Sequence, residues 1–96
     1  MKMVTIIYDS EIDNQMMVIL KRANVEKYTK IEDVRGVGSS GAKLNNPIGP
    51  GINSMVIVVV DDNTAESLKK SLSALKKSTI EKSGFKAIIT PVEEFI

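Results

Sequence analysis

The residues best suited to ligand chemistry lie in a glycine- and proline-rich stretch, GVGSSGAKLNNPIGPGIN, at positions 36–53. This stretch holds five of the six glycines and two of the three prolines. Gly36, Gly38 and Gly41 form the pattern GxGxxG, which in dinucleotide-binding proteins opens a helix that holds a pyrophosphate at its N-terminus. Here prolines such as Pro50 follow instead of a helix, so the pattern does not predict a dinucleotide site.

The same stretch has two other interpretations. Backbone N–H groups around the glycines could form a nest for an anion, with positive charge from Arg35 or Lys43. A plain connection between two strands is the simpler alternative. Eighteen residues is long for such a connection, and long loops in compact domains are commonly functional or disordered. Length and composition therefore favour a functional loop.

The other reactive residue types do not predict an enzyme. Histidine and cysteine are absent, which removes the commonest general base, the thiolate nucleophile and the soft metal ligands. The adjacent carboxylates Asp61-Asp62 and Glu93-Glu94 are expected to cap a helix and to lie solvated near the end of the chain. No catalytic residue and no metal site are predicted, and the five methionines are assigned to packing.

Nucleic-acid and membrane partners are not expected either. The net charge is only +1, which gives no field to attract nucleic acid. An RNA-binding sheet would carry stacking aromatics on its central strands, whereas Met55–Val60 has none. The opening residues, MKMVTIIYDSE, meet acidic residues too early for a secretory signal, and no apolar run has membrane-spanning length. We expect a cytoplasmic protein without membrane insertion.

The elements that must position these residues follow the order βαββαβ in a single domain, residues 1–96, with the loop at 37–53. Runs of β-branched and apolar residues predict strands at Met3–Tyr8, Tyr28–Gly38, Met55–Val60 and Phe85–Val92.

Helical spacing of apolar residues predicts the two helices between these strands. The first follows the cap signal Asp9-Ser10 and ends near Ala23. The second is predicted to begin with a capping box formed by Asn63 and Glu66. Its apolar stripe consists of Ala65, Leu68, Leu72 and Leu75.

This order predicts an α+β, ferredoxin-like fold with a four-stranded antiparallel sheet. Right-handed crossovers place both helices on one face of such a sheet. Pro91 should lie on an edge strand, because proline cannot donate to the ladder.

One feature of the strands predicts an oligomer. A sheet covered on one face should alternate apolar and polar residues, yet Met55–Val60 is apolar throughout and Met3–Tyr8 nearly so. Nothing in this chain remains to cover the second face. We therefore expect another subunit to cover it.

Three segments resemble the PII family of signalling proteins: residues 25–29 (VEKYT), 34–38 (VRGVG) and 86–94 (KAIITPVEE). Members of that family are trimers of βαββαβ subunits with a long loop, the T-loop, between the second and third strands. Small effectors, commonly adenine nucleotides, bind between subunits at the base of this loop, and the loop engages a target protein. The resemblance implies a trimeric regulatory protein of this kind.

The resemblance also implies site residues. Thr29 matches the family's threonine beside the adenine, and Lys86 matches a phosphate-contacting lysine. The implied effector is an adenine nucleotide or another small anion, and the implied partner is a target such as a transporter or an enzyme. The expected effector-binding residues are Thr29, Arg35, Gly36, Gly38, Lys43 and Lys86, and the expected partner loop contains Ser39, Ser40, Gly41, Pro50, Gly51 and Asn53.

Two alternatives share the fold. The CutA-like trimers, linked to divalent-cation tolerance, are similar in plan but carry a structured, aromatic-rich hairpin where this chain has glycine and proline. Small-molecule regulatory domains of the ACT type are more often dimers or fused to enzymes.

Overall fold

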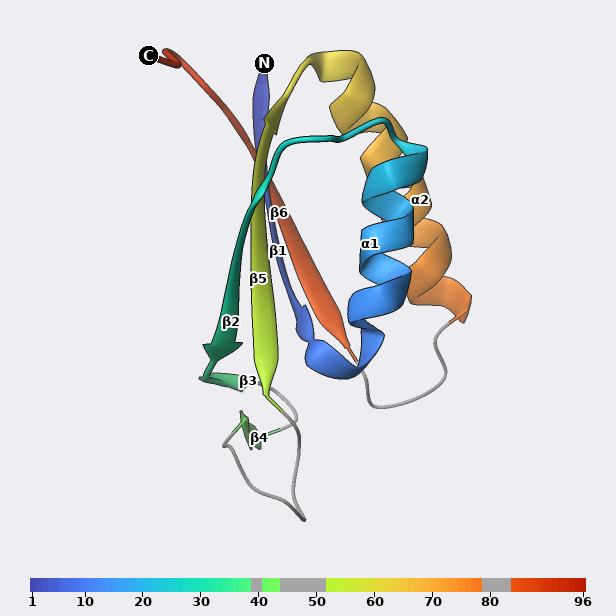
Figure 1. Ribbon diagram of the computed structural model, residues 1–96, viewed down its shortest axis with the longest axis vertical. Coiled ribbons are helices and arrows are strands. Elements are labelled where there is room, and N and C mark those ends of the chain that lie inside the picture. The colour runs from blue at the N-terminus through green and yellow to red at the C-terminus, as the bar shows by residue number, and fades with distance from the viewer. Residues whose placement is uncertain (39–40, 44–51, 79–83) are drawn as a thin grey trace.

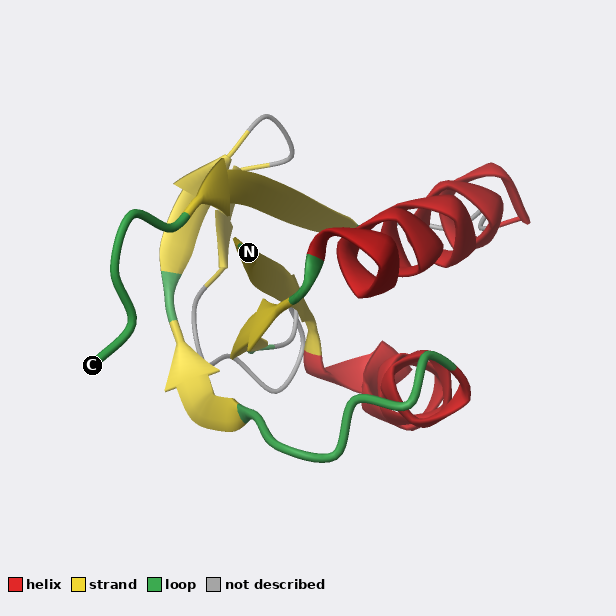
Figure 2. Cartoon of the chain, turned by 90° about the horizontal axis from the view of Figure 1, so that it is seen from above, coloured by secondary structure: helices red, strands yellow, loops and turns green. Residues whose placement is uncertain are grey.

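The computed structural model describes residues 1–38, 41–43, 52–78 and 84–96. A four-stranded antiparallel sheet carries both α-helices on one of its faces (Figure 1, Figure 2). The elements in chain order are β1 (Lys2–Asp9), the 3₁₀ helix η1 (Ser10–Ile12), α1 (Asp13–Arg22), β2 (Thr29–Val34), β3 (Gly36–Gly38), β4 (Gly41–Lys43), β5 (Asn53–Val60), α2 (Asp62–Ser78) and β6 (Phe85–Pro91). The predicted ferredoxin-like α+β fold is confirmed, with a short hairpin added.

The strand order is β2-β5-β1-β6, so β5 and β1 are central and β2 and β6 lie at the edges. β1 pairs along its whole length with β5, from Lys2 opposite Val60 to Asp9 opposite Asn53. Pro91 ends the edge strand β6 opposite Lys2, which confirms its predicted place at an edge.

The core lies between the sheet and the helices. Every second residue of the two central strands is buried there, namely Val4, Ile6 and Tyr8 of β1 and Ser54, Val56 and Val58 of β5. The predicted stripe of α2 packs against them: Ala65, Leu68 and Leu72 are buried and Leu75 is partly buried. In the described part of the chain, neither helix has the length and apolar content needed to cross a membrane.

The start of α2 differs in detail from the prediction. α2 begins at Asp62, and its first turn is capped by Asp61, whose carboxylate accepts a hydrogen bond from the Thr64 N–H at 2.7 Å. The predicted capping box of Asn63 and Glu66 is therefore wrong, whereas the capping role expected of the Asp61-Asp62 pair is confirmed at Asp61. An aspartate directly before the helix has the same capping chemistry as an asparagine within its first turn, and spacing alone does not separate the two.

At the end of α1 the chain turns through Asn24, which has a φ of 62°. The Asn24 N–H donates to the Lys21 carbonyl and the Val25 N–H donates to the Leu20 carbonyl. These bonds satisfy carbonyls that the helix end leaves without partners. Asparagine tolerates this left-handed conformation better than most residues do, so α1 stops here without a glycine.

The second predicted strand, Tyr28–Gly38, is not continuous. β2 pairs with β5, but its register shifts between Ile31 and Val34, and Asp33 at this bulge has a φ of 61°. The chain leaves the main sheet at Arg35, and the next three residues pair with β4 as a separate two-stranded sheet. A bulge bends its strand and increases the local twist, which accounts for the change of direction at the base of the hairpin.

Candidate functional site

The face of the sheet opposite the helices, called here the open face, is largely apolar. The register places Ile7 beside Met55, and Ile57 beside Thr5, on this face. Ile31 on β2 and Ile88 on β6 are 41% and 47% exposed. This face carries the apolar second surface that the sequence predicted.

Two of the predicted effector residues lie at opposite edges of this open face. Thr29 begins β2, opposite Ile57, and Lys86 lies near the start of β6, opposite Ile7. Both are exposed. Three strand spacings of about 4.8 Å separate the two edges, or roughly 14 Å. Within one chain these two side chains therefore do not face a common small ligand.

Arg35 and Gly36 lie where β2 passes into the hairpin, and both are exposed. A Cβ placed on Gly36 would meet no atom of the chain within 4 Å, and its φ is outside the left-handed range. Neither packing within the described chain nor backbone conformation requires glycine at this position. The backbone of Gly36 is open to an approaching group.

The remaining predicted residues are distributed over the hairpin and the segment after it. Gly36 pairs with Lys43, and Gly38 with Gly41, across the β3–β4 hairpin. The expected single loop at 37–53 is thus interrupted by these strands. Asn53 belongs to β5, where it pairs with Asp9 and Val34. Ser39, Ser40, Pro50 and Gly51 lie outside the described residues.

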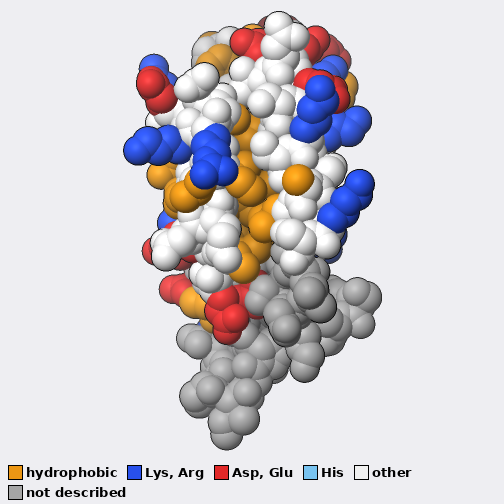
Figure 3. All heavy atoms as spheres, turned by 90° about the vertical axis from the view of Figure 1, so that its right-hand side faces the viewer, with side chains coloured by type: hydrophobic (Ala, Val, Ile, Leu, Met, Phe, Trp, Pro, Cys, Tyr) orange, Lys and Arg blue, Asp and Glu red, His pale blue; other side chains and the backbone are white. Residues whose placement is uncertain are grey.

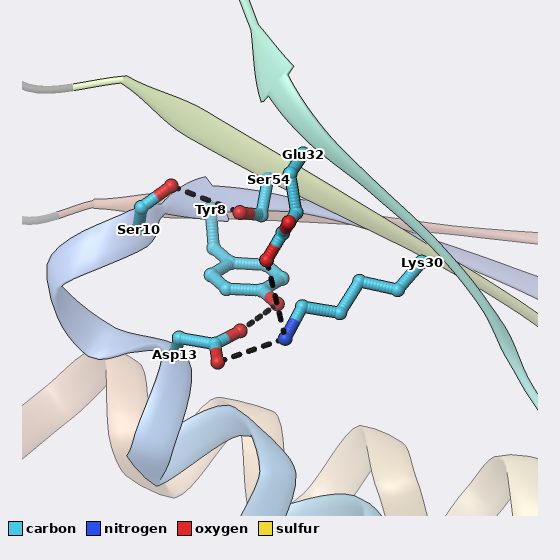
Figure 4. Close-up of polar contacts among 6 residues, drawn as sticks. All are labelled: Tyr8, Ser10, Asp13, Lys30, Glu32 and Ser54. Atoms are coloured by element: carbon cyan, nitrogen blue, oxygen red, sulfur yellow. Dashed lines mark hydrogen bonds and ion pairs between the residues drawn. The ribbon is translucent and has the colours of Figure 1, made fainter.

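A polar network that the sequence did not predict links three elements just above the hairpin (Figure 4). Asp13, the first residue of α1, accepts a hydrogen bond from the Tyr8 hydroxyl at 2.5 Å and one from the Lys30 ammonium at 2.9 Å. The Lys30 ammonium also lies 3.9 Å from a carboxylate oxygen of Glu32. The Asp13 carboxylate therefore ties β1 and β2 to the beginning of α1.

The surroundings keep Tyr8, Asp13 and Lys30 in their ordinary charge states at neutral pH. Burial raises the pKa of Tyr8, and the hydrogen bond to Asp13 raises it further. Burial alone would raise the pKa of Asp13, but hydrogen bonds from Tyr8 and Lys30 outweigh it and hold the pKa below its ordinary value of 3.8. The hydrogen bond to Asp13 raises the pKa of Lys30. None of the three is poised near pH 7 as a general acid or base, so the network acts as a structural tie.

A second polar contact lies beside the network, between the hydroxyls of Ser10 and Ser54 at 2.9 Å. It joins η1 to β5 where that strand begins. In the sequence, Tyr8 is simply an aromatic residue near the end of a strand, and Asp13 is a residue near a helix start. Only the approach of β2 to α1 in three dimensions identifies Lys30 as their partner.

Charge at the hairpin end of the molecule is mixed. Acidic side chains lie at this end on the helix-bearing side (Figure 3), and the bulge of β2 contributes Glu32 and Asp33. Within the described residues, no group of three histidine, cysteine or acidic side chains is arranged to hold a metal ion. An anion bound here would depend on the positive charge of residues such as Arg35 and Lys86.

The whole chain matches the family model described as nitrogen regulatory protein P-II, over residues 1–96. The protein belongs to the P-II family. This confirms the resemblance seen in the sequence and decides against the CutA-like and ACT-type alternatives. No curated protein sequence matches the chain significantly.

Solved structures support the same fold. CPII, a nitrogen regulatory PII-like protein from Thiomonas intermedia K12, bound to ADP, AMP and bicarbonate, has a TM-score of 0.77 and 19% identity, over 93% of this chain and 82% of CPII. A protein of Thermus thermophilus assigned as PII-like and signalling has a TM-score of 0.61 and 22% identity, over 93% and 82% of the two chains.

Proposed function

We propose that this protein is a cytoplasmic, trimeric regulator without enzymatic activity. It senses a small anion, an adenine nucleotide or a compound such as bicarbonate, in a cleft between subunits. The segment from Gly36 to β5 then changes shape and controls a target protein. Family membership and the structural relationship to CPII, which was solved with ADP, AMP and bicarbonate, support the choice of effector class.

One observation carries the proposal: the predicted effector residues Thr29 and Lys86 lie on the same open face but at opposite edges. Contact between the open faces of neighbouring subunits is the arrangement that brings Thr29 of one subunit near Lys86 of the next. The same contact covers Ile31 and Ile88, whose exposure in a single chain is otherwise unfavourable. A closed ring of three such contacts is a common symmetric solution.

The base of the hairpin provides the backbone side of this cleft. Gly36 has open space where a Cβ would stand, so a ligand can approach its backbone closely. Arg35, one residue earlier, supplies a guanidinium suited to phosphate or carboxylate oxygens. Because the bulge at Asp33 sets the direction of the chain just before these residues, ligand contact at Arg35 is well placed to redirect the hairpin.

Calorimetric titration tests the proposal. We expect ADP, AMP, ATP or bicarbonate to bind the wild-type protein, and the double variant Arg35→Ala/Lys86→Ala to lose that binding while its mass in solution stays unchanged. The matched control, Arg22→Ala/Lys70→Ala, removes the same two charges from the exposed surfaces of α1 and α2. Equal affinity in both double variants would remove the proposed site.

A further inference from the structure

A groove of about 900 Å³ lies between α2 and the edge strand β6, on the helix-bearing side of the sheet. Ala65 and Leu72 of α2 line it from one side, and Phe85, Ala87 and Ile89 of β6 from the other. Ala87 is the smallest of the three β6 residues and stands between the two bulkier ones, so the apolar floor offers most room there. Apolar surface of this kind is usually covered by a ligand or a partner.

The directions of the edge strands decide how two copies of the chain can meet at this groove. β2 runs in the same direction as β1, because both pair antiparallel with β5, and β6 runs antiparallel to β1. A closed ring of subunits around an axis along the strands keeps these directions. In such a ring, β2 of one subunit runs antiparallel to β6 of the next.

This direction places Tyr28 of one subunit at the groove of the next. With Thr29 beside Lys86, the residue before Thr29 lies opposite the residue after Lys86 in an antiparallel arrangement, and these two residues are Tyr28 and Ala87. Side chains alternate between the two faces of a sheet, so both belong to the helix-bearing side, where Ala87 lines the groove. Tyr28 is 45% exposed within one chain. It therefore has ring surface to bury in the roomiest part of the floor.

The opposite wall of the groove at this point is the middle of α2. The Lys76 ammonium donates to the Phe85 carbonyl, which places the end of α2 beside the start of β6, and the two elements run in opposite directions (Figure 1). One helical turn of about 5.4 Å back from Lys76 nearly equals two strand residues, about 6.6 Å, onward from Phe85. Ser73 is therefore level with Ala87 across the groove, and it is one of the lining residues.

The rim of the groove carries more basic than acidic side chains, with Lys2, Lys69, Lys76 and Lys77 against Asp62 and Glu66. The segment before β2 supplies an exposed carboxylate, Glu26, two residues from Tyr28. Two residues of extended chain span about 7 Å, so Glu26 reaches the rim when Tyr28 lies on the floor. Lys69, one turn before Ser73 on α2, is the rim lysine on that side.

We propose that Tyr28 of one subunit fills the groove between α2 and β6 of the next, and that Glu26 of the same subunit pairs with Lys69 on its rim. This contact rests on the proposed function, which places Thr29 beside Lys86, and it extends that interface around the sheet edge to the helix-bearing side. The occupant of the groove is a second copy of this chain. Each subunit of the ring gives one tyrosine and receives one.

Cross-linking with a short bismaleimide tests the position of Tyr28. The chain has no cysteine, so Tyr28→Cys/Ser73→Cys carries thiols only at the two positions that the proposal brings together. We expect this variant to give covalent dimers and trimers on a denaturing gel. The matched control, Tyr28→Cys/Ser67→Cys, has its second thiol at an exposed position of α2 that does not line the groove. It should run as single chains.

Light scattering on the same samples before the reaction separates this proposal from the proposed function. A trimer that gives no cross-link with Ser73→Cys, or that cross-links equally with Ser67→Cys, would overturn the groove contact and leave the proposed trimer standing. A monomeric wild type would overturn both.

A charge exchange tests the pairing of Glu26 with Lys69. Glu26→Lys should raise the concentration at which half of the trimers dissociate by about tenfold, because an attraction becomes a repulsion at each of three contacts. Adding Lys69→Glu should restore most of the loss. Adding Lys70→Glu, on the same helix but outside the groove lining, should restore little. Sedimentation over a dilution series measures this, and equal recovery with the two added substitutions would overturn the pairing.

Discussion

At the scale of single residues, the account depends most on the hydrogen bonds that Asp13 accepts. Tyr8 donates to it from β1 and Lys30 from β2, and hydrogen bonds to a charged group contribute more than neutral ones. We expect Tyr8→Phe to lower the free energy of unfolding by about 2 kcal/mol, measured by urea denaturation. The other tyrosine, Tyr28, is 45% exposed, so Tyr28→Phe is the matched control and should change little. Equal effects of the two substitutions would show that the network contributes nothing.

The lowered pKa of Asp13 also predicts a pH dependence. A carboxyl whose folded pKa lies below its ordinary value of 3.8 contributes stability that is present above that value and is lost as the pH falls through the folded pKa. Wild type should therefore be more stable than Asp13→Asn at neutral pH, and the difference should shrink on acidification below about pH 4. Denaturation at a series of pH values measures this. A difference that grew toward acid would contradict the assigned charge state.

A substitution at Gly36 should affect ligand binding without affecting the stability of the fold. A Cβ there meets no atom within 4 Å, so Gly36→Ala should leave the thermal midpoint nearly unchanged. If a ligand approaches this backbone closely, the added methyl group should nevertheless weaken nucleotide or bicarbonate binding. Thermal unfolding and calorimetry on the same sample test both halves. A destabilised variant would mean that the hairpin itself requires glycine at this position.

At the scale of elements, much of the fold follows from the sequence pattern, because period-two and helical spacing directly reflect burial. Helical spacing predicted the stripe of α2, runs of β-branched and apolar residues predicted the four main strands, and the missing N–H of proline predicted the edge position of Pro91. The bulge at Asp33, the β3–β4 hairpin and the Tyr8–Asp13–Lys30 network were not predicted. Each depends on how separate elements meet in space, and no local pattern carries that information.

Two neighbouring positions, Asp61 and Asn63, could cap the start of α2. The sequence indicated both the Asp61-Asp62 pair and Asn63 as caps, and Asp61 makes the capping hydrogen bond. The backbone hydrogen bond from Thr64 also lowers the pKa of Asp61. Asp61→Ala should therefore lower the thermal midpoint by a few degrees, and Asn63→Ala should not. A larger fall in thermal midpoint for Asn63→Ala than for Asp61→Ala would show that Asn63 is the cap.

The bulge in β2 predicts how substitutions of Asp33 change the stability of the protein. Asp33 has a φ of 61°, a region that β-branched residues strongly disfavour. Asp33→Val should cost about 1–2 kcal/mol of stability, while Asp33→Gly should be close to neutral, as judged by chemical denaturation. Similar stability of the two variants would mean that the bulge relaxes readily and does not fix the direction of the hairpin.

At the scale of the whole molecule, the two faces of the sheet differ in what covers them. The open face, with Ile31 and Ile88 exposed at its edges, is assigned to contact between subunits. The helix-bearing side carries α1 and α2, with a lysine-rimmed groove between α2 and β6. The sequence indicated the contact between subunits through the apolar run of β5, but the groove became apparent only when α2 was placed beside an edge strand.

The most direct test of the central claim is the mass in solution, measured by light scattering after size exclusion over a tenfold dilution, for wild type, Ile88→Lys and Val18→Lys. Ile88 lies on the open face and Val18 on α1, and the two are similarly exposed, at 47% and 45%. The account predicts three times the chain mass of 10.5 kDa for wild type and Val18→Lys, and a smaller species for Ile88→Lys. A monomeric wild type, or an Ile88→Lys variant that remains trimeric, would contradict it.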